Sequence, residues 1–426
     1  MAKPKLALIP ASQGTKLYSV LPADGVGDFN FSRNTVATRI NKDGLIETVA
    51  SGVSRLNYPL IDGVVNGCPS HLLEPERLQK IQYSEDFSNA VWEKNQSSIV
   101  ANAIISPNGT LNASKLVEDS SNNFHRIIEN VNTTIGTFSH SVFAKAGERK
   151  YFVLRNNISG SNLNACFDLE NGVVVYNGFD EAKIENYGNG WYRCSIVEID
   201  TSGGSTSFSL MTSNNEVTSN SIPSYQGDGT SGIYIWGAQV EQGSYATSYI
   251  PNYGTSAGIT RSAETANGAG DASTFNDSEG VLMAEISALA ESSTYRFISL
   301  SDGTLSNRVS LFLSNNNTLN GSANGVSSIA SVVDIKNNNK VAYKYKSGDY
   351  SLWANGFEVG TLTVTTGNHS NLNRLNFDYG QGSDDFYGST KQIQYFDSAL
   401  NDSDLETLTS WTSFTDLANG QTYSIK

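Results

Sequence analysis

The sequence predicts an all-β protein built from more than one domain. Glycine is abundant and only 16% of residues are charged, a composition typical of chains rich in turns. Apolar and polar residues alternate in short runs, such as FSHSVFAK at 138–145 and YFVLR at 151–155. The chain has 426 residues, and single cores rarely grow beyond about 250–300 residues. We therefore expect two antiparallel β-sandwiches.

The first 80 residues predict a docking segment. Residues 1–27 are interrupted by Pro and Gly and are weakly periodic, whereas 28–80 contain short strands with turns at 42–44 and 61–63. The segment has too little apolar content for a large core of its own. We expect residues 1–80 to dock onto the chain's own sandwich, another subunit or a neighbouring protein.

Two β units follow, joined by a polar stretch. Residues 81–251 show short alternating runs with turn signals between them, which predicts an antiparallel sandwich. Residues 252–278 lack bulky apolar side chains and predict a linker, or a strap across a surface. Residues 279–411 predict a second sandwich that ends in a short helix, with Asn401 or Ser403 as N-cap. Residues 412–426 predict a tail with one strand.

Charge and cysteine content narrow the functional classes. The net charge is −14 with no Lys/Arg cluster, so we expect no nucleic-acid partner. No apolar run is long enough for a membrane span, and the apolar run near the N-terminus is too short for a signal peptide. We therefore expect synthesis in the cytoplasm without export or membrane insertion. For Cys166 and Cys194 we expect buried free thiols rather than a disulfide.

Catalytic patterns are largely missing. Glu198-Ile199-Asp200 begins a strand motif that places alternating carboxylates on one face, as glycoside hydrolysis requires, but Gly203 stands where the third carboxylate should be. The four histidines are scattered, and none has a metal-binding spacing. We expect no enzyme activity and no cofactor, with structural Ca²⁺ as an open alternative.

Binding chemistry remains, because aromatic rings, amides and carboxylates together can hold sugars. The stretches around 122–126 and 384–387 combine such groups, and the tyrosines near 225 and 245 lie in turns where we expect exposure. The candidate carbohydrate-binding residues are Asn123, His125, Arg126, Tyr225, Tyr245, Asp385 and Tyr387. Asp228 and Asp384, in Gly-rich loops, are candidate Ca²⁺ ligands.

Several long motifs resemble a module of tailed-bacteriophage virion proteins. They are LLEPERLQKIQYSEDFSNAVWEK at 72–94, YQGDGTSGIYIWGAQVEQGSYATSYIP at 225–251, FNFSRNTVATRINKDGLIE at 29–47, YGNGWYRCS at 187–195 and TRSA at 260–263. In that family, the first two bracket a jelly roll of the carbohydrate-binding-module type. The resemblance covers roughly residues 28–263 and implies this fold for 81–251.

The second unit carries a separate resemblance. YSLWANGFEVGTL, LNRLNFDYG and FYGSTKQIQYFDSALNDSDLETL follow one another in the order of the C-terminal half of laminin-G and concanavalin-like domains. Those domains occur in lectins, glucanases and adhesion proteins, so the resemblance implies a fold rather than a function.

Together the resemblances imply a structural protein of a phage virion surface, a tail or head fibre or spike that presents lectin-like domains to host or environmental glycans. Residues 1–80 would contact other virion proteins, and such proteins usually assemble as homo-oligomers, often trimers. Two alternatives stay open: a purely structural capsid or tail decoration protein, and a polysaccharide-degrading enzyme.

Overall fold

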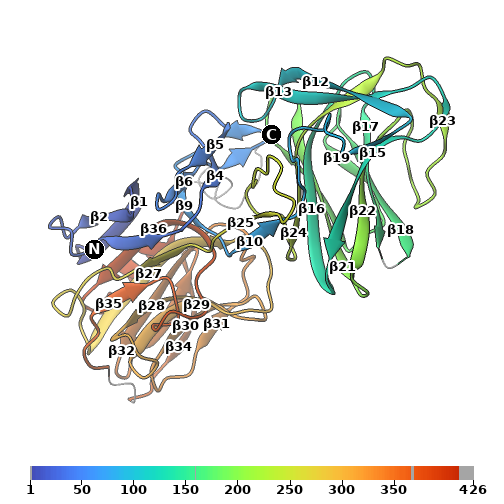
Figure 1. The fold of residues 1–426 in the computed structure, drawn as a ribbon. Helices are drawn as coiled ribbons and strands as arrows, with labels where there is room; N and C mark the ends of the chain where they lie inside the picture. The colour runs from blue at the N-terminus through green and yellow to red at the C-terminus, as the bar shows by residue number, and fades with distance from the viewer. Residues whose placement is uncertain (1, 159, 366–368, 412–426) are drawn as a thin grey trace.

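The computed structural model describes residues 2–158, 160–365 and 369–411, and the predicted tail at 412–426 lies outside them. The described chain is almost entirely β and forms two lobes (Figure 1), which confirms the predicted all-β class. Each lobe is a sandwich of two antiparallel sheets. Cys166 and Cys194 are buried free thiols, as expected, and Cys68 is an exposed one.

The first lobe packs two six-stranded sheets around one apolar core. One sheet, here called the outer sheet, has the order β11 (Glu93–Asn95), β15 (His125–Thr133), β22 (Gly204–Ser213), β17 (Tyr151–Ile158), β18 (Ser161–Asp168) and β19 (Val173–Asn177). The other, the inner sheet, has the order β12 (Ser97–Ile105), β13 (Leu111–Glu118), β24 (Gly232–Gln242), β16 (Gly136–Ala146), β21 (Trp191–Asp200) and β20 (Glu181–Asn186). Alternating residues such as Phe152 and Leu154 fill the core between the sheets, as strand geometry requires.

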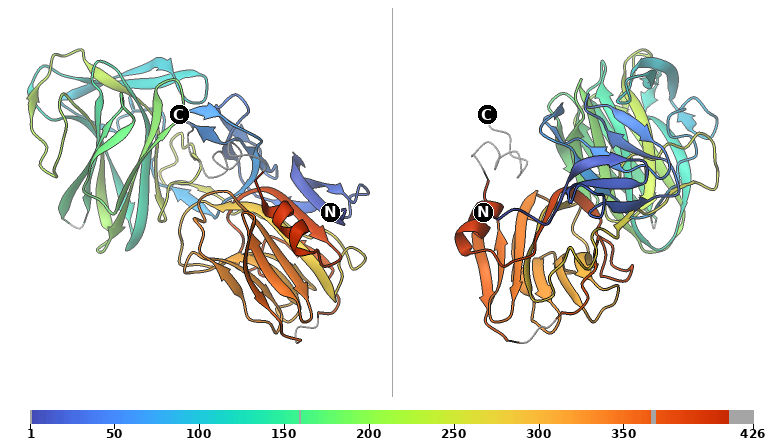
Figure 2. Two further views of the ribbon diagram at one scale, coloured as in Figure 1. Left: turned by 180° about the vertical axis from the view of Figure 1, so that it is seen from behind. Right: turned by 90° about the vertical axis from the view of Figure 1, so that its left-hand side faces the viewer.

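The second lobe packs an eleven-stranded sheet on a five-stranded one. The large sheet runs β26 (Thr265–Asn267), β3 (Phe29–Ser32), β2 (Lys16–Leu21), β1 (Leu6–Gln13), β36 (Gly388–Phe396), β27 (Glu279–Ala288), β32 (Asn339–Lys346), β33 (Tyr350–Ala354) and β34 (Phe357–Leu362), with β9 (Ser70–Leu73) paired to β36 and β6 (Arg55–Asn57) to β9. The small sheet runs β31 (Ile329–Ser331), β30 (Leu319–Ala323), β29 (Arg308–Leu313), β28 (Arg296–Ser301) and β35 (Arg374–Asn376). Helix α1 (Asp402–Thr409) covers the outside of the large sheet with Leu405 and Leu408 (Figure 2).

The N-terminal residues dock onto the chain's own second sandwich, one of the three partners considered from the sequence. Strand β1 pairs with β36, and Leu6, Leu8 and Leu17 belong to the same core as the C-terminal strands. The weak periodicity of residues 1–27 did not predict these strands. The pairing of β1 with β2 shifts register twice between Ala7 and Ser12, and such irregularities disrupt the two-residue alternation that marks a strand.

Four two-stranded sheets complete the architecture. They are β4 (Ala37–Ile40) with β5 (Ile46–Val49), β7 (Leu60–Ile61) with β8 (Val64–Val65), β10 (Arg77–Gln79) with β25 (Ile259–Arg261), and β14 (Asn122–Asn123) with β23 (Tyr225–Gln226). Strands β25 and β26 both lie within 252–278, and they pair with β10 and β3 respectively. The stretch is therefore a strap attached to both lobes rather than a free linker.

A buried ionic network lies where the two lobes and the strap meet. Glu264 accepts hydrogen bonds from Arg33 (2.6 Å) and from Arg55 Nε (2.8 Å), and Glu74 pairs with Arg55 (2.8 Å) and Arg261 (2.7 Å). The side chains of all five residues are at most 4% exposed. Burial alone would raise the pKa of Glu74, but Arg261 and Arg55 outweigh it and hold that pKa well below its usual range.

Candidate functional site

The structure buries two predicted contact residues, His125 and Tyr225. The His125 side chain is inaccessible, and its Nδ1 lies 2.7 Å from the carbonyl oxygen of Gln96. Tyr225 is 8% exposed, packs edge-on against the His125 ring at 4.6 Å, and donates its hydroxyl hydrogen to Glu118 (2.7 Å). The expectation that Tyr225 is exposed is therefore wrong, because β14–β23 pairing turns its ring inward. Asn123, in the same pair of strands, accepts a hydrogen bond from the Phe124 amide (2.8 Å).

Three other predicted residues lie at the junction of the two lobes. Tyr245 is half-buried, with the Arg77 guanidinium 5.3 Å from its ring centre. Tyr387 donates a hydrogen bond to Asp385 (3.2 Å) and is close enough for Tyr245 and Arg77 to affect its pKa. Burial raises the pKa of Tyr245 to about 12. Tyr245 thus lies near Asp385 and Tyr387, although about 140 positions of the chain separate it from them.

The two candidate Ca²⁺ ligands lie in different lobes. Asp228 closes a turn by accepting hydrogen bonds from the Ser231 hydroxyl (2.5 Å), the Ser231 amide (2.7 Å) and the Thr230 amide (2.8 Å), and these bonds hold its pKa below its usual range. Asp384 is exposed, and its carbonyl oxygen accepts a hydrogen bond from the Phe297 amide (3.0 Å). Within 2–158, 160–365 and 369–411, no three His, Cys, Asp or Glu side chains converge as a metal site would need.

The candidate glycosidase carboxylates are buried and already have partners inside the protein. Glu198 is 1% exposed and lies 2.6 Å from Nε2 of His140. Asp200 is 1% exposed and accepts a hydrogen bond from the Thr133 hydroxyl (2.6 Å). Both side chains therefore contribute to internal hydrogen bonding rather than to an open groove.

Arg126, the remaining predicted residue, lies on the solvent side of the outer sheet of the first lobe. Its neighbours along β15, Ile127 and Val131, point into the core, so strand alternation turns Arg126 and Asn130 outward. Two strands away, Arg155 of β17 lies on the same face by the same alternation, because Phe152 and Leu154 point inward. We call the surface formed by Arg126, Asn130, Arg155, Asn157, Asn162 and Ser207 the arginine face.

The two arginines of this face form no ion pair among the described residues, although the Glu93 carboxylate on the neighbouring strand β11 is close enough to act on Arg126. The Nε atom of Arg126 is buried without a hydrogen-bond partner within the described ranges. Arg155 donates one long hydrogen bond to Asn164 (3.4 Å). Burial lowers the pKa of both guanidinium groups; Glu93 opposes the lowering for Arg126, and the positive charge of Arg126 adds to the lowering for Arg155.

This arrangement can recognise an anion that also carries hydroxyl groups. Guanidinium groups bind carboxylates through two parallel hydrogen bonds. Amide and hydroxyl side chains such as Asn157, Asn162 and Ser207 supply further donors and acceptors. Arg155 was not among the residues predicted from the sequence, although the alternation in YFVLRNN places it on the opposite face of the strand from the core residues Phe152 and Leu154.

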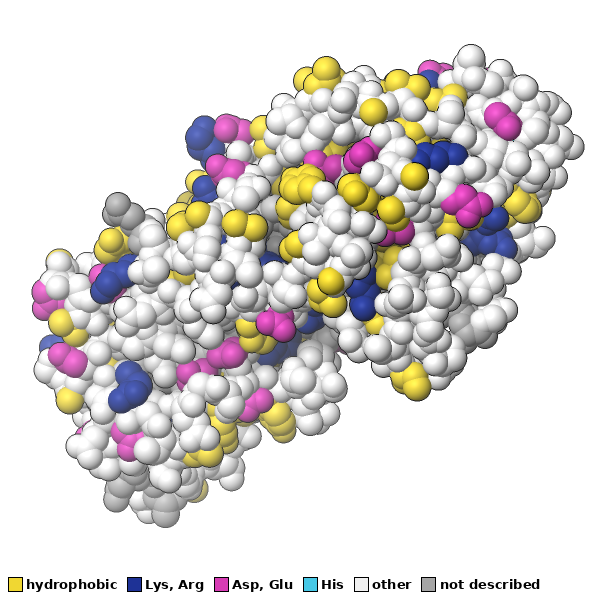
Figure 3. Space-filling view, in the orientation of Figure 1, with side chains coloured by type: hydrophobic (Ala, Val, Ile, Leu, Met, Phe, Trp, Pro, Cys, Tyr) yellow, Lys and Arg dark blue, Asp and Glu magenta, His cyan; other side chains and the backbone are white. Residues whose placement is uncertain are grey.

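On the face of the molecule drawn in Figure 3, acidic and basic side chains are scattered over both lobes rather than gathered in one charged patch. No described helix is long and apolar enough to span a membrane.

Comparison with known proteins gives matches to solved structures alone. No protein-family model matches the chain, and no curated protein matches it. Among solved structures, the CBM40 module of the Ruminococcus gnavus IT-sialidase, bound to α2,3-sialyllactose, shares 20% identity. The match covers 34% of this chain and 88% of that one, with a TM-score of 0.30.

Two further solved structures match a similar share of the chain. Domain 4 of AbnA, a GH43 extracellular arabinanase from Geobacillus stearothermophilus in complex with arabinotriose, shares 11% identity over 35% of this chain and 73% of that one (TM-score 0.30). A leech intramolecular trans-sialidase shares 16% identity over 33% of this chain and 24% of that one (TM-score 0.29). At these identities and TM-scores, the matches carry no argument about a ligand.

Proposed function

We propose that this chain is a glycan-binding protein that holds a carboxylate-bearing sugar on the arginine face. One observation carries the proposal: Arg126 and Arg155 lie on the same face of the outer sheet, two strands apart, partly buried and without ion pairs among the described residues, with amide and hydroxyl side chains around them. Unpaired arginines are unexpected in a chain with a net charge of −14, because carboxylates to pair with them are plentiful. A ligand carboxylate would supply the missing partner.

The proposed role is binding without catalysis. Glycoside hydrolysis needs two carboxylates facing one sugar, and the best candidates, Glu198 and Asp200, are buried and hydrogen-bonded inside the first lobe. An adhesive role needs only a stable surface, and Arg126 and Arg155 lie on hydrogen-bonded strands that hold them in position.

We further propose that the protein works on the surface of a phage virion, as a tail or head fibre or spike. This part rests on the resemblance of the motifs at 29–47, 72–94 and 225–251 to virion proteins. A decoration protein with purely structural contacts is the alternative, and glycan binding distinguishes the two.

The test compares 3′-sialyllactose with lactose, which differ by one carboxylate-bearing sugar, by calorimetric titration of the full chain. We expect saturable binding of sialyllactose alone. Arg126→Gln and Arg155→Gln should each weaken it at least ~10-fold, since a charge-assisted hydrogen bond contributes about 1.5–3 kcal/mol. Lys391→Gln removes a positive charge from the other lobe and should leave the affinity unchanged.

Two results would contradict the proposal. Equal affinities for lactose and sialyllactose would show that the protein does not recognise the carboxylate of the ligand. Unchanged sialyllactose binding in the double variant Arg126→Gln/Arg155→Gln would place the site elsewhere. If a uronate polymer such as alginate and neutral glycans also failed to bind, the decoration role would be favoured.

A further inference from the structure

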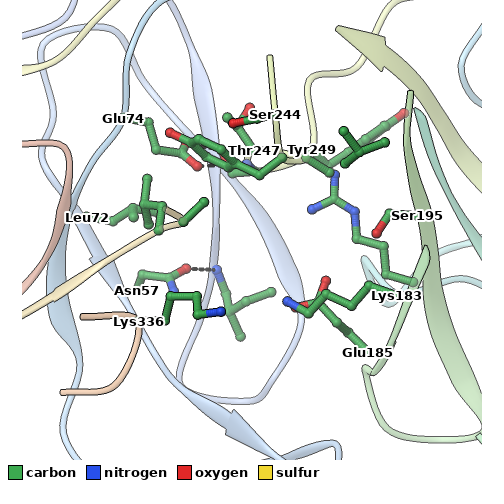
Figure 4. Close-up of a pocket in the computed structure, with 18 of the residues that line it drawn as sticks. Asn57, Leu72, Glu74, Lys183, Glu185, Ser195, Ser244, Thr247, Tyr249 and Lys336 are labelled. Carbon is green, nitrogen blue, oxygen red and sulfur yellow. Dashed lines mark hydrogen bonds and ion pairs between the residues drawn. The ribbon is translucent and has the colours of Figure 1, made fainter. Parts of the chain in front are cut away.

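A cavity of about 800 Å³ opens between the two lobes, away from the arginine face. Its walls come from three parts of the chain: the N-terminal segment, the inner sheet of the first lobe, and the second lobe. In Figure 4, Lys183, Glu185 and Ser195 lie on one side, Leu72, Asn57 and Lys336 on the other, and the segment from Ser244 to Tyr249 closes one end. Lys183 and Lys336 are exposed, so the cavity communicates with solvent.

Arg193, in β21, is the unusual member of this wall. It is 4% exposed, its Nη2 donates a hydrogen bond to the Ser141 hydroxyl (2.9 Å), and its guanidinium lies 5.5 Å from the ring centre of Phe143. Its Nε atom is buried and has no hydrogen-bond partner in the described ranges. Tyr187, also in the wall, is close enough for Arg193 to lower its pKa against the larger effect of burial, which raises it.

The other basic side chains of the cavity wall all have acidic partners. The pairs are Arg39 with Glu47 (2.9 Å), Lys183 with Glu185 (2.6 Å) and Lys336 with Glu291 (3.5 Å). The Glu74 carboxylate, which also reaches the wall, is already engaged by Arg55 and Arg261. Among the described residues, Arg193 thus forms no ion pair, although it is the most buried cation of the wall.

We infer that the cavity is a second ligand site, in which Arg193 binds the carboxylate of a small molecule. Glu185 lies opposite Arg193 in the pairing of β20 with β21, but Lys183 already engages its carboxylate. Burying the Arg193 charge without an ion pair of its own is costly, and a neutral ligand would not relieve that cost. A volume of about 800 Å³ lies within the range of small-molecule sites. The Tyr187 and Tyr245 rings and the Ser195 hydroxyl offer contacts for the rest of the ligand. The carboxylate could belong to a sugar acid or to a simple organic acid.

The experiment titrates the full chain with sodium glucuronate, glucose and sodium acetate, followed by calorimetry. Saturable binding of glucuronate but not glucose is expected. Arg193→Gln should weaken it at least ~10-fold, because the charge-assisted pair is lost. Lys150→Gln, which removes a paired surface cation of the first lobe outside the cavity wall, is the control and should change the affinity less than ~3-fold.

The other arms separate the sources of the carboxylate and the two proposed sites. Acetate binding as tight as glucuronate binding would identify organic acids as the ligand class, whereas glucuronate binding alone would identify a sugar acid. The variant Arg126→Gln/Arg155→Gln should retain glucuronate binding at the cavity. The experiment can therefore refute a site on the arginine face without refuting the cavity site, and it can refute the cavity site without refuting the arginine face.

The inference is overturned if the wild-type protein binds neither carboxylate, or if Arg193→Gln binds glucuronate as the wild type does. Should Arg193→Gln fail to fold, judged by circular dichroism, Arg193→Lys serves in its place. Lysine keeps the charge but loses the planar pair of donors, so its affinity should still fall, and an unchanged affinity would count against the site.

Discussion

At the scale of single residues, burial decides which side chains can act. Tyr225 and Tyr253 both lie in turn-like sequence, yet the first is 8% exposed and the second 73%. Tyr225 departs from the exposure that its sequence context predicts, because β-strand pairing with Asn123 turns its ring inward. Residue type and local pattern therefore identify candidate ligand contacts, while accessibility depends on segments about 100 positions away.

Glu129 shows how burial alone changes the chemistry of one residue. It is 3% exposed, its Oε1 accepts a hydrogen bond from the Gln82 amide (2.8 Å), and its Oε2 has no partner among the described residues. Burial raises the pKa of Glu129 from its usual 4.5 to about 7, against a smaller opposing effect of the Gln82 hydrogen bond.

We predict that Glu129→Gln stabilises the protein above pH 7 and has little effect near pH 4.5. The pKa of Glu129 is higher in the folded than in the unfolded protein. Protonated Glu129 therefore contributes its full share of the folding stability below pH 4.5, and this share is lost as the pH rises through about 7. The loss at pH 8 is roughly 3 kcal/mol, from 1.36 kcal/mol per pKa unit. Urea unfolding at pH 5 and pH 8 measures it, with the exposed Glu93→Gln as control. Equal effects at the two pH values would contradict the prediction.

At the scale of elements, turn and cap residues act over a few positions and can be recognised in the sequence. The Asn355-Gly356 pair has positive φ angles of 52° and 89° and joins β33 to β34, as expected for a tight hairpin turn. The C-terminal helix begins after Asn401, one of the two predicted N-caps. Its Oδ1 accepts a hydrogen bond from the Asp404 amide (2.9 Å).

We predict that Asn401→Ala lowers the free energy of unfolding by about 1 kcal/mol, because the helix loses its cap. Ser403→Ala, which changes the other predicted cap position inside the first turn, should cost less. Thermal and urea unfolding of the two variants give the comparison. A larger loss in Ser403→Ala would mean that the helix is capped differently.

At the scale of the whole molecule, the buried ionic network joins the N-terminal segment to the strap at the junction of the two lobes. The five residues Arg33, Arg55, Glu74, Arg261 and Glu264 come from four separate stretches of the chain. Four of them lie within or next to the motifs at 29–47, 72–94 and 260–263 that resemble virion proteins. A structural reason for those motifs is therefore the packing of both lobes onto the strap.

We predict that Glu264→Gln destabilises the protein by roughly 3–5 kcal/mol, because Arg33 and Arg55 lose a shared buried counter-charge. Glu47→Gln, which breaks the partly exposed pair with Arg39, should cost less than about 1 kcal/mol. Denaturant unfolding of both variants tests the difference. Similar losses would show that the network contributes no more than a surface pair.

Local sequence alone predicted the all-β class, the two sandwiches, the C-terminal helix with Asn401 or Ser403 as its cap, and the free buried thiols, because periodicity, turn residues and capping act over a few positions. Only the tertiary structure decided that residues 6–32 complete the second sandwich, that Arg126 and Arg155 share one face, and that Arg193 lines a cavity without a counter-ion. These features depend on which distant strands pair and on what is left uncovered, and both are settled by packing over the whole chain.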